Sequence, residues 1–299
     1  MSDYLYDGKG PPDPEVARLE ELLAPMRYRG AAPRPRARRW PFYAAAAATA
    51  AMAAAAPIVL RPRVEPWAVE DVAGTPTCGG APCRALPLEQ WLETDGASRA
   101  RLTVAKLGRM DVEPGTRVRR KAAHRLELAV GAISARVSAP PRLLVVDTPT
   151  AAAVDLGCAY RLMVAEGGAT HLEVTWGWVS LEAPGRSVYV PAGAEAWTTP
   201  GAGPGTPVFL DAPAALREAV ARVDAGDAAA VAAAVAAARA RDTLSLLHLV
   251  PRVAGDARVA VVDRILALGP PPPLPRERLL AADAAALDRW RETLAPSWY

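Results

Sequence analysis

The chain has 299 residues, with 35 lysines and arginines against 32 aspartates and glutamates, so its formal net charge is +3. Together with a hydrophobic content of 51%, this near balance excludes a highly charged disordered chain and a strongly basic nucleic-acid-binding domain. We therefore expect no direct nucleic-acid partner, and a length that accommodates two modest folded units beside shorter segments.

The first predicted element is a short amphipathic helix from Asp13 to Leu23, within an N-terminal segment, 1–39. Asp13 suits the cap of this helix and Pro14 its first turn. Four apolar side chains recur at helical spacing and form one stripe: Val16, Leu19, Leu22 and Leu23. Such a stripe docks onto a partner or lies along a membrane surface.

An uncharged, alanine-rich stretch follows at 40–60. Its 21 residues match the length of helix that crosses a bilayer, about 20 residues. Two other interpretations compete, a soluble alanine-rich helix and the core of a cleaved signal peptide. The stretch predicts a transmembrane helix, with the lipid bilayer as a partner.

Basic residues are unequally distributed around this stretch. Six arginines precede it, including Arg34, Arg36, Arg38 and Arg39, whereas only two follow it closely. The positive-inside rule then places the N-terminus in the cytoplasm and the bulk of the chain outside. The expected location is the inner membrane of a bacterium, crossed once, with the later domains in the periplasm.

Residues 61–86 are rich in proline and glycine and are expected to form a linker. Cys78 and Cys83 lie in it, on the side predicted to be oxidising, and could close a small disulfide loop or remain two unpaired thiols. Cys158 lies in an apolar run and is expected to be a buried thiol.

From 87 to 207 the sequence changes to short β-rich runs separated by glycine and proline turns. Several runs alternate in polarity, as half-buried antiparallel strands do. The predicted strands are RLTVAKL, TRVRR, HRLELAV, AISARVS, RLLVVDT, AAVDLG, AYRLMV, THLEVTWGWVSLE and RSVYVPA. This pattern predicts an all-β sandwich or barrel-like domain.

Helical periodicity returns after Pro213. Five segments within 211–299 begin at aspartate or proline and carry apolar residues at helical spacing. The predicted fold is therefore multidomain α+β: a short cytoplasmic helix, one transmembrane helix, a β domain, and a small α-helical domain at the C-terminus.

The β segment resembles the periplasmic FecR domain. The family pattern has a strand ending in a glycine turn, then V-x-T-P, V-x-x-x-G-x-x-[FY], V-x-x-G-x-V and a closing V-x-A-G. The matching positions cover much of 87–207: Gly131, Thr148, Pro149, Gly157, Tyr160, Gly177, Val179, Pro191, Ala192 and Gly193. Cys158 stands where threonine is usual in the family.

FecR-like proteins are single-span regulators whose cytoplasmic part binds a sigma factor of the extracytoplasmic-function type and whose outer domain receives an envelope signal. The resemblance implies the same anti-sigma-type signalling here, with the stripe on the first helix as the sigma-binding surface. It also implies a periplasmic or outer-membrane protein, or an envelope polymer, as a partner. The alternative function is an envelope binding or scaffold protein with a FecR domain and no sigma-factor partner.

The sequence contains no recognisable set of catalytic residues. The three histidines, His124, His171 and His248, lie far apart in the sequence, and no set of ligands at metal-binding spacing accompanies them. We therefore expect no enzyme activity, no cofactor and no metal. Trp176 and Trp178 alternate along one strand and should face the same side, either packed in the core or exposed as a pair for a ligand or partner.

Overall fold

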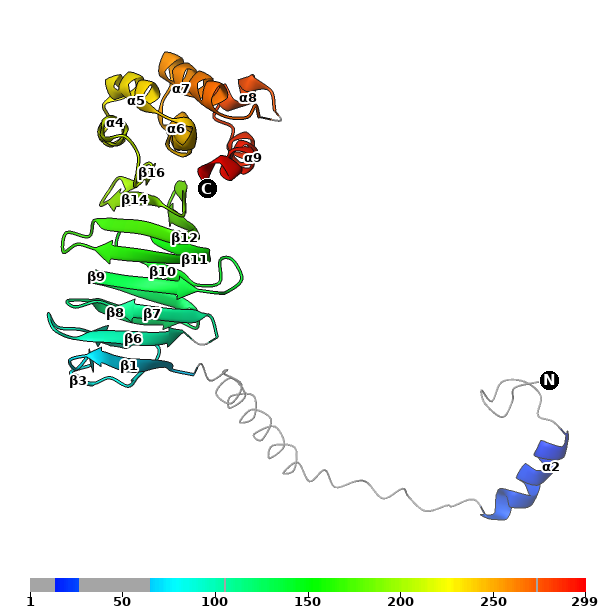
Figure 1. Ribbon diagram of the computed structural model, residues 1–299. Helices are drawn as coiled ribbons and strands as arrows, with labels where there is room; N and C mark the ends of the chain where they lie inside the picture. The colour runs from blue at the N-terminus through cyan, green and yellow to red at the C-terminus, as the bar shows by residue number, and fades with distance from the viewer. Residues whose placement is uncertain (1–13, 27–64, 105, 273) are drawn as a thin grey trace. The chain divides into compact units, whose positions relative to one another are not determined.

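The structure is a computed structural model that describes residues 14–26, 65–104, 106–272 and 274–299. The chain divides into two compact units, Met1–Pro62 and Arg63–Tyr299. In the first unit, the described elements are the helix α2 (Pro14–Leu23) and a 3-10 turn (Ala24–Met26). The second unit contains the described strands and the remaining described helices (Figure 1).

The predicted transmembrane helix is not found in the described part of the chain. The longest helix there, α7 (Gly255–Leu268), has 14 residues, whereas a bilayer core of about 30 Å needs about 20 residues. None of the described helices is both long and apolar enough to cross a membrane. The stretch 40–60 and the arginines Arg34, Arg36, Arg38 and Arg39 lie outside the described residues. The expected transmembrane helix and single-pass inner-membrane location are therefore withdrawn.

In the described part of the second unit, sixteen strands form one mixed sheet. They are β1 (Trp67–Ala73), β2 (Thr77–Cys78), β3 (Ala81–Pro82), β4 (Ala85–Leu86), β5 (Trp91–Glu93), β6 (Arg99–Val104), β7 (Gly108–Val112), β8 (Arg117–Ala122), β9 (Arg125–Val137), β10 (Val145–Asp147), β11 (Ala152–Val164), β12 (Thr170–Ala183), β13 (Arg186–Pro191), β14 (Ala194–Thr199), β15 (Gly203–Pro204) and β16 (Val208–Phe209). Neighbouring strands are antiparallel except β9 and β10, which run parallel.

The three long strands β9, β11 and β12 each turn a corner and are shared by two halves of this sheet. The first half-sheet contains β5, β8, β10 and β13, and the second contains β1, β6, β7 and β14. Gly131, Gly157 and Gly177 lie within the three long strands and have positive φ angles of 93°, 87° and 72°, a conformation that favours glycine. In Figure 1, β7 and β8 lie at the same level of the stack.

This arrangement corrects the expectation of a sandwich or barrel-like domain. A sandwich has two separate sheets, but here the hydrogen-bonded ladder continues through the glycine corners. For the same reason, two pairs of runs predicted as separate strands are the single strands β9 and β11.

The segment 61–86, which was expected to be a linker, contains the strands β1 to β4. Their alternating apolar side chains explain the difference. Trp67, Val69 and Leu86 are buried in the common core, so this proline-containing stretch gains from pairing with β6.

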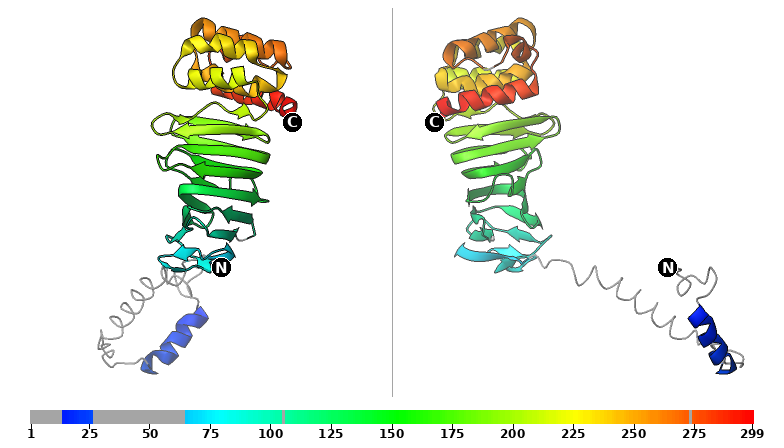
Figure 2. Two further views of the ribbon diagram at one scale, coloured as in Figure 1. Left: turned by 60° about the vertical axis from the view of Figure 1, so that its left-hand side comes forward. Right: turned by 90° about the vertical axis from the view of Figure 1, so that its right-hand side faces the viewer.

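Among the residues that the structure describes, six α-helices follow the sheet: α4 (Ala214–Asp224), α5 (Val231–Ala237), α6 (Thr243–Leu249), α7, α8 (Arg276–Leu280) and α9 (Ala284–Leu294). The last predicted helical segment is divided into α8 and α9. Ala282 has a φ of 53°, and the Asp283 side chain accepts a hydrogen bond from the backbone N–H of Ala286, which starts α9. In both views of Figure 2, the helices lie at the β14 end of the sheet, and one hydrophobic core runs through strands and helices.

Candidate binding sites

The apolar stripe of α2 is exposed. Leu19, Leu22 and Leu23 have relative exposures of 58%, 68% and 55%, and Val16 is partly buried. Glu21, on the other side of the helix, is exposed as well. An amphipathic helix with leucines at this spacing fits a hydrophobic groove on a partner.

A second candidate site is a cavity of about 590 Å³ between the strands β14 and β15 and the helix α4. We call it the Trp197 pocket. Its walls are largely apolar, from Ala202, Val208, Val220 and Ala221. Concave, mostly apolar cavities with a few polar groups are the usual form of a small-molecule site.

The indole of Trp197 forms one wall of this pocket and is 50% exposed. The ring of His171 stacks on it, with centroids 4.0 Å apart and an interplanar angle of 13°. His171 Nε2 lies 2.8 Å from Glu195 Oε2, and Arg217 Nη2 donates to Glu195 Oε1 at 2.6 Å. Strands β12 and β14 and helix α4 thus hold the tryptophan in one orientation.

The lining of the pocket carries a second charged pair. Arg252 lies 2.5 Å from Asp224, and the same carboxylate accepts hydrogen bonds from the backbone N–H and the hydroxyl of Thr206. A Cβ on Gly205 would lie 2.7 Å from this carboxylate. Because both carboxylates of the pocket are neutralised by arginines, its chemistry suits an uncharged ligand with a flat face for Trp197.

Sequence reasoning missed this pocket. The pattern around His171 linked it to no metal or catalytic site, and no prediction singled out Glu195, Trp197 or Arg217. The available signal was the alternation on β14, where Glu195 and Trp197 face the same side. Only the pairing of β12 with β14 sets His171 opposite Trp197 and Glu173 opposite Glu195.

The structure places the two tryptophans of β12 in different surroundings. Trp176 is 64% exposed and opposes Ala159 on β11. Trp178 opposes Pro191 on β13, and its ring packs against Trp298 and Tyr299. The corner at Gly177 and a register shift at Ala159 interrupt the regular alternation between them.

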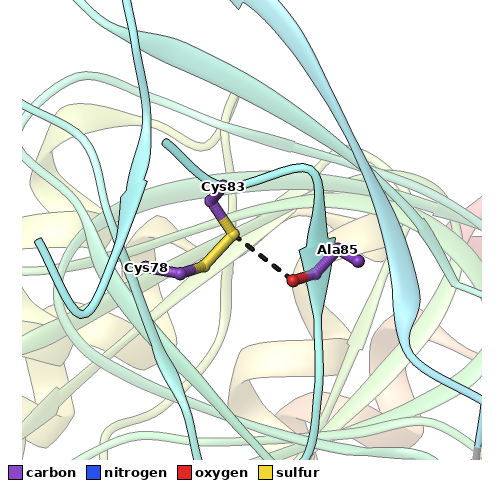
Figure 3. Close-up of a disulfide and its surroundings, with 3 residues drawn as sticks. All are labelled: Cys78, Cys83 and Ala85. Carbon is purple, nitrogen blue, oxygen red and sulfur yellow. Dashed lines mark hydrogen bonds between the residues drawn. A yellow bond between two sulfur atoms is a disulfide. The ribbon is translucent and has the colours of Figure 1, made fainter. Parts of the chain in front are cut away.

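Cys78 and Cys83 are joined by a disulfide, with Cα atoms 4.9 Å apart. Figure 3 shows this bridge, with Cys83 Sγ 3.5 Å from the carbonyl oxygen of Ala85. Both cysteines are buried, and the bridge closes the turn between β2 and β3. Cys158 is a buried free thiol.

The described residues contain no group of three or more histidine, cysteine, aspartate or glutamate side chains that could hold a metal ion. The expectations about enzyme activity and cofactors are not tested by this finding.

Comparison with known proteins adds little. No model of a known protein family matches the chain, and no curated protein sequence matches it. Two crystal structures of a "putative anti-sigma factor" from Parabacteroides distasonis, at 1.65 Å and 2.50 Å resolution, are similar to part of it. Each is 14% identical, has a TM-score of 0.34, and covers 44% of this chain and 64% of its own. Similarity at this level carries no argument about function.

Proposed function

We propose that this chain is a regulator of the anti-sigma type, in which α2 binds a sigma factor of the extracytoplasmic-function class and the second unit binds a signal ligand. The observation that carries the proposal is the exposed stripe of Leu19, Leu22 and Leu23. The resemblance of the β segment to the FecR domain supplies the class of partner.

The energetics of the stripe support a role in binding. Full burial of one leucine side chain contributes roughly 1.5–3 kcal/mol, so three leucines in a groove give several kcal/mol before ordering costs. Glu15 lies in the first turn of α2, where a negative charge favours the helix dipole. The helix is therefore suited to hold the stripe in a binding conformation.

The test is binding of the full chain to the purified sigma factor encoded nearest to its gene. The variant Leu19→Asp with Leu22→Asp places two charges in the stripe and should weaken binding by roughly 100-fold or more. The control, Ala17→Glu with Ala24→Glu, changes the net charge by the same amount on the side of the helix away from the leucines and should bind as the wild type does. Equal binding by both variants would contradict the proposal.

A second candidate function is that of a ligand-binding scaffold without a sigma-factor partner. The Trp197 pocket favours it, because the pocket is complete within the second unit and needs no part of α2. In that case, no sigma factor binds the full chain, and both α2 variants behave as the wild type in every binding assay.

A further inference from the structure

The register and the alternating burial place two parallel rows of outward-facing side chains across the second half-sheet, over the strands β6, β7, β9, β11 and β12. Figure 1 labels these strands. The first row is Arg101, Asp111, Ser134, Arg161 and Glu173. Its charges are compensated: Arg101 Nε lies 2.6 Å from Asp111, and Arg161 forms a two-point ion pair with Glu113. Stabilisation of the sheet by cross-strand pairs accounts for this row.

The second row is different. It contains Thr103, Arg109, Arg136, Ala159 and Trp176, each opposite the next in register. Arg109 and Arg136 are directly opposite one another and both are exposed. Within the described residues, neither guanidinium makes an ion pair or a hydrogen bond. Two like charges placed in this way destabilise a sheet, so the fold does not account for this pair.

The two arginines line a shallow groove of about 660 Å³, which we call the arginine groove. Ala159 lies in its lining, opposite Arg136 on one side and Trp176 on the other, and Trp176 follows the lining residue Thr175 at the end of the groove. The indole of Trp176 is 64% exposed, because the register shift opposite Ala159 turns it outward. At a strand spacing of about 4.8 Å, Arg109 and Trp176 are about 14 Å apart.

We propose that the arginine groove binds a linear carboxylated polysaccharide, laid along the row from Arg109 to Trp176. The paired guanidinium groups would hold a carboxylate of one uronic-acid residue through charge-assisted hydrogen bonds. The apolar C–H face of a further sugar ring would pack on the indole of Trp176, whose negative ring face attracts it. This binding goes beyond the proposed function and does not depend on a sigma factor.

The groove's own carboxylates favour a polymer with spaced charges over a dense polyanion. Asp111 and Glu173 lie in the lining beside the arginines and would repel a chain that carries a phosphate at every unit. A single-stranded nucleic acid needs a continuous basic groove with several stacking aromatics, whereas this row offers two adjacent arginines and one tryptophan.

The test is calorimetric titration of the full chain with oligogalacturonate and with hyaluronate oligosaccharides, at low and high salt. The wild type should bind at least one of these, and more weakly at high salt. Arg109→Gln with Arg136→Gln should reduce the affinity roughly tenfold or more, and Trp176→Ala should also reduce it. The matched control, Arg84→Gln with Arg289→Gln, removes the same charge from exposed arginines outside the groove and should leave the affinity unchanged.

Three results would overturn the proposal. One is no binding of either carboxylated polymer by the wild type. The second is an equal loss of affinity in the control and in the groove variant, which would indicate a general charge effect. The third is inorganic polyphosphate binding as tightly as the sugars with no effect of Trp176→Ala, which would indicate an anion site without a sugar-binding face. A neutral dextran should not bind in any case, because it has no carboxylate for the arginines.

Discussion

The backbone N–H of Tyr189 donates a hydrogen bond to Nε2 of His248 at 3.1 Å. Tyr189 lies on β13, whose only described strand partner is β12, and His248 lies on α6. The other ring nitrogen, Nδ1, is 2.9 Å from the carbonyl oxygen of Leu244, so the ring is neutral with its proton on Nδ1. A histidine of the helical part thus covers the free edge of the sheet, which would otherwise be open to pairing with other chains.

This relationship predicts a pH-dependent stability. Burial, aided by the nearby Arg291 and Arg252 and opposed by Asp288, lowers the pKa of His248 to about 4. Between pH 6.5 and 4 the unfolded chain therefore binds a proton that the folded chain does not, and the free energy of unfolding falls as the pH falls. The expected loss is up to about 3 kcal/mol. Urea denaturation at pH 7 and pH 4.5 measures it.

The control for this prediction is His248→Gln. Other groups also titrate in this range, so the difference between wild type and variant isolates the histidine. The variant should be less stable at pH 7 but should lose less stability on acidification. Parallel pH profiles of the two proteins would show that His248 is not the group responsible.

Replacing a glycine by alanine should reduce the stability of the fold more at a strand corner than in an open turn. Gly177 has a φ of 72°, and a Cβ there would overlap the carbonyl oxygen of Gly157 on the neighbouring strand. Gly185 has a similar φ of 74° but open space around its Cα. Gly185→Ala should cost about 1–2 kcal/mol from the backbone conformation alone, and Gly177→Ala should cost several kcal/mol more because a strand must move. Thermal unfolding of both variants tests this, and equal losses would refute the role of Gly177 as a corner.

A buried carboxylate in β11 predicts an opposite pH effect. Asp155 is fully buried, its Oδ1 accepts a hydrogen bond from Cys158 Sγ, and its Oδ2 has no partner among the described residues. Burial raises the pKa of Asp155, so the folded state holds a proton more tightly than the unfolded state and stability is lost as the pH rises through this pKa. The free energy of unfolding of Asp155→Asn, relative to that of the wild type, should therefore rise from pH 4 to pH 8. Denaturation curves with no such trend would contradict the assignment.

The disulfide predicts both a thiol count and a stability change. Before reduction, the denatured chain should show one reactive thiol, Cys158, and after reduction three. Closing so short a loop contributes about 2 kcal/mol by the chain-entropy relation, so Cys78→Ser with Cys83→Ser should lower the unfolding free energy by about that amount. Three thiols in the unreduced protein would show that the bridge does not form.

Local patterns in the sequence predicted several of the longer strands and the helices after the sheet, but not β1 to β4, which lie in the stretch expected to be a linker. The alternating run RLTVAKL, 101–107, predicts a half-buried strand, and β6 (Arg99–Val104) contains its first four residues. Pro213 precedes the first helix after the sheet, α4. Such features depend on the conformation and burial of neighbouring residues, so a short window of sequence contains them.

The tertiary structure alone decided how the strands pair. Register is a property of two segments that are distant in the sequence, and a shift by one residue exchanges the two faces of a strand. The sequence therefore did not reveal that Arg109 opposes Arg136 or that His171 opposes Trp197. Nor did it show that Gly131, Gly157 and Gly177 bend continuous strands rather than end them, because a turn and a corner require the same positive φ and differ only in the hydrogen bonds that continue beyond them.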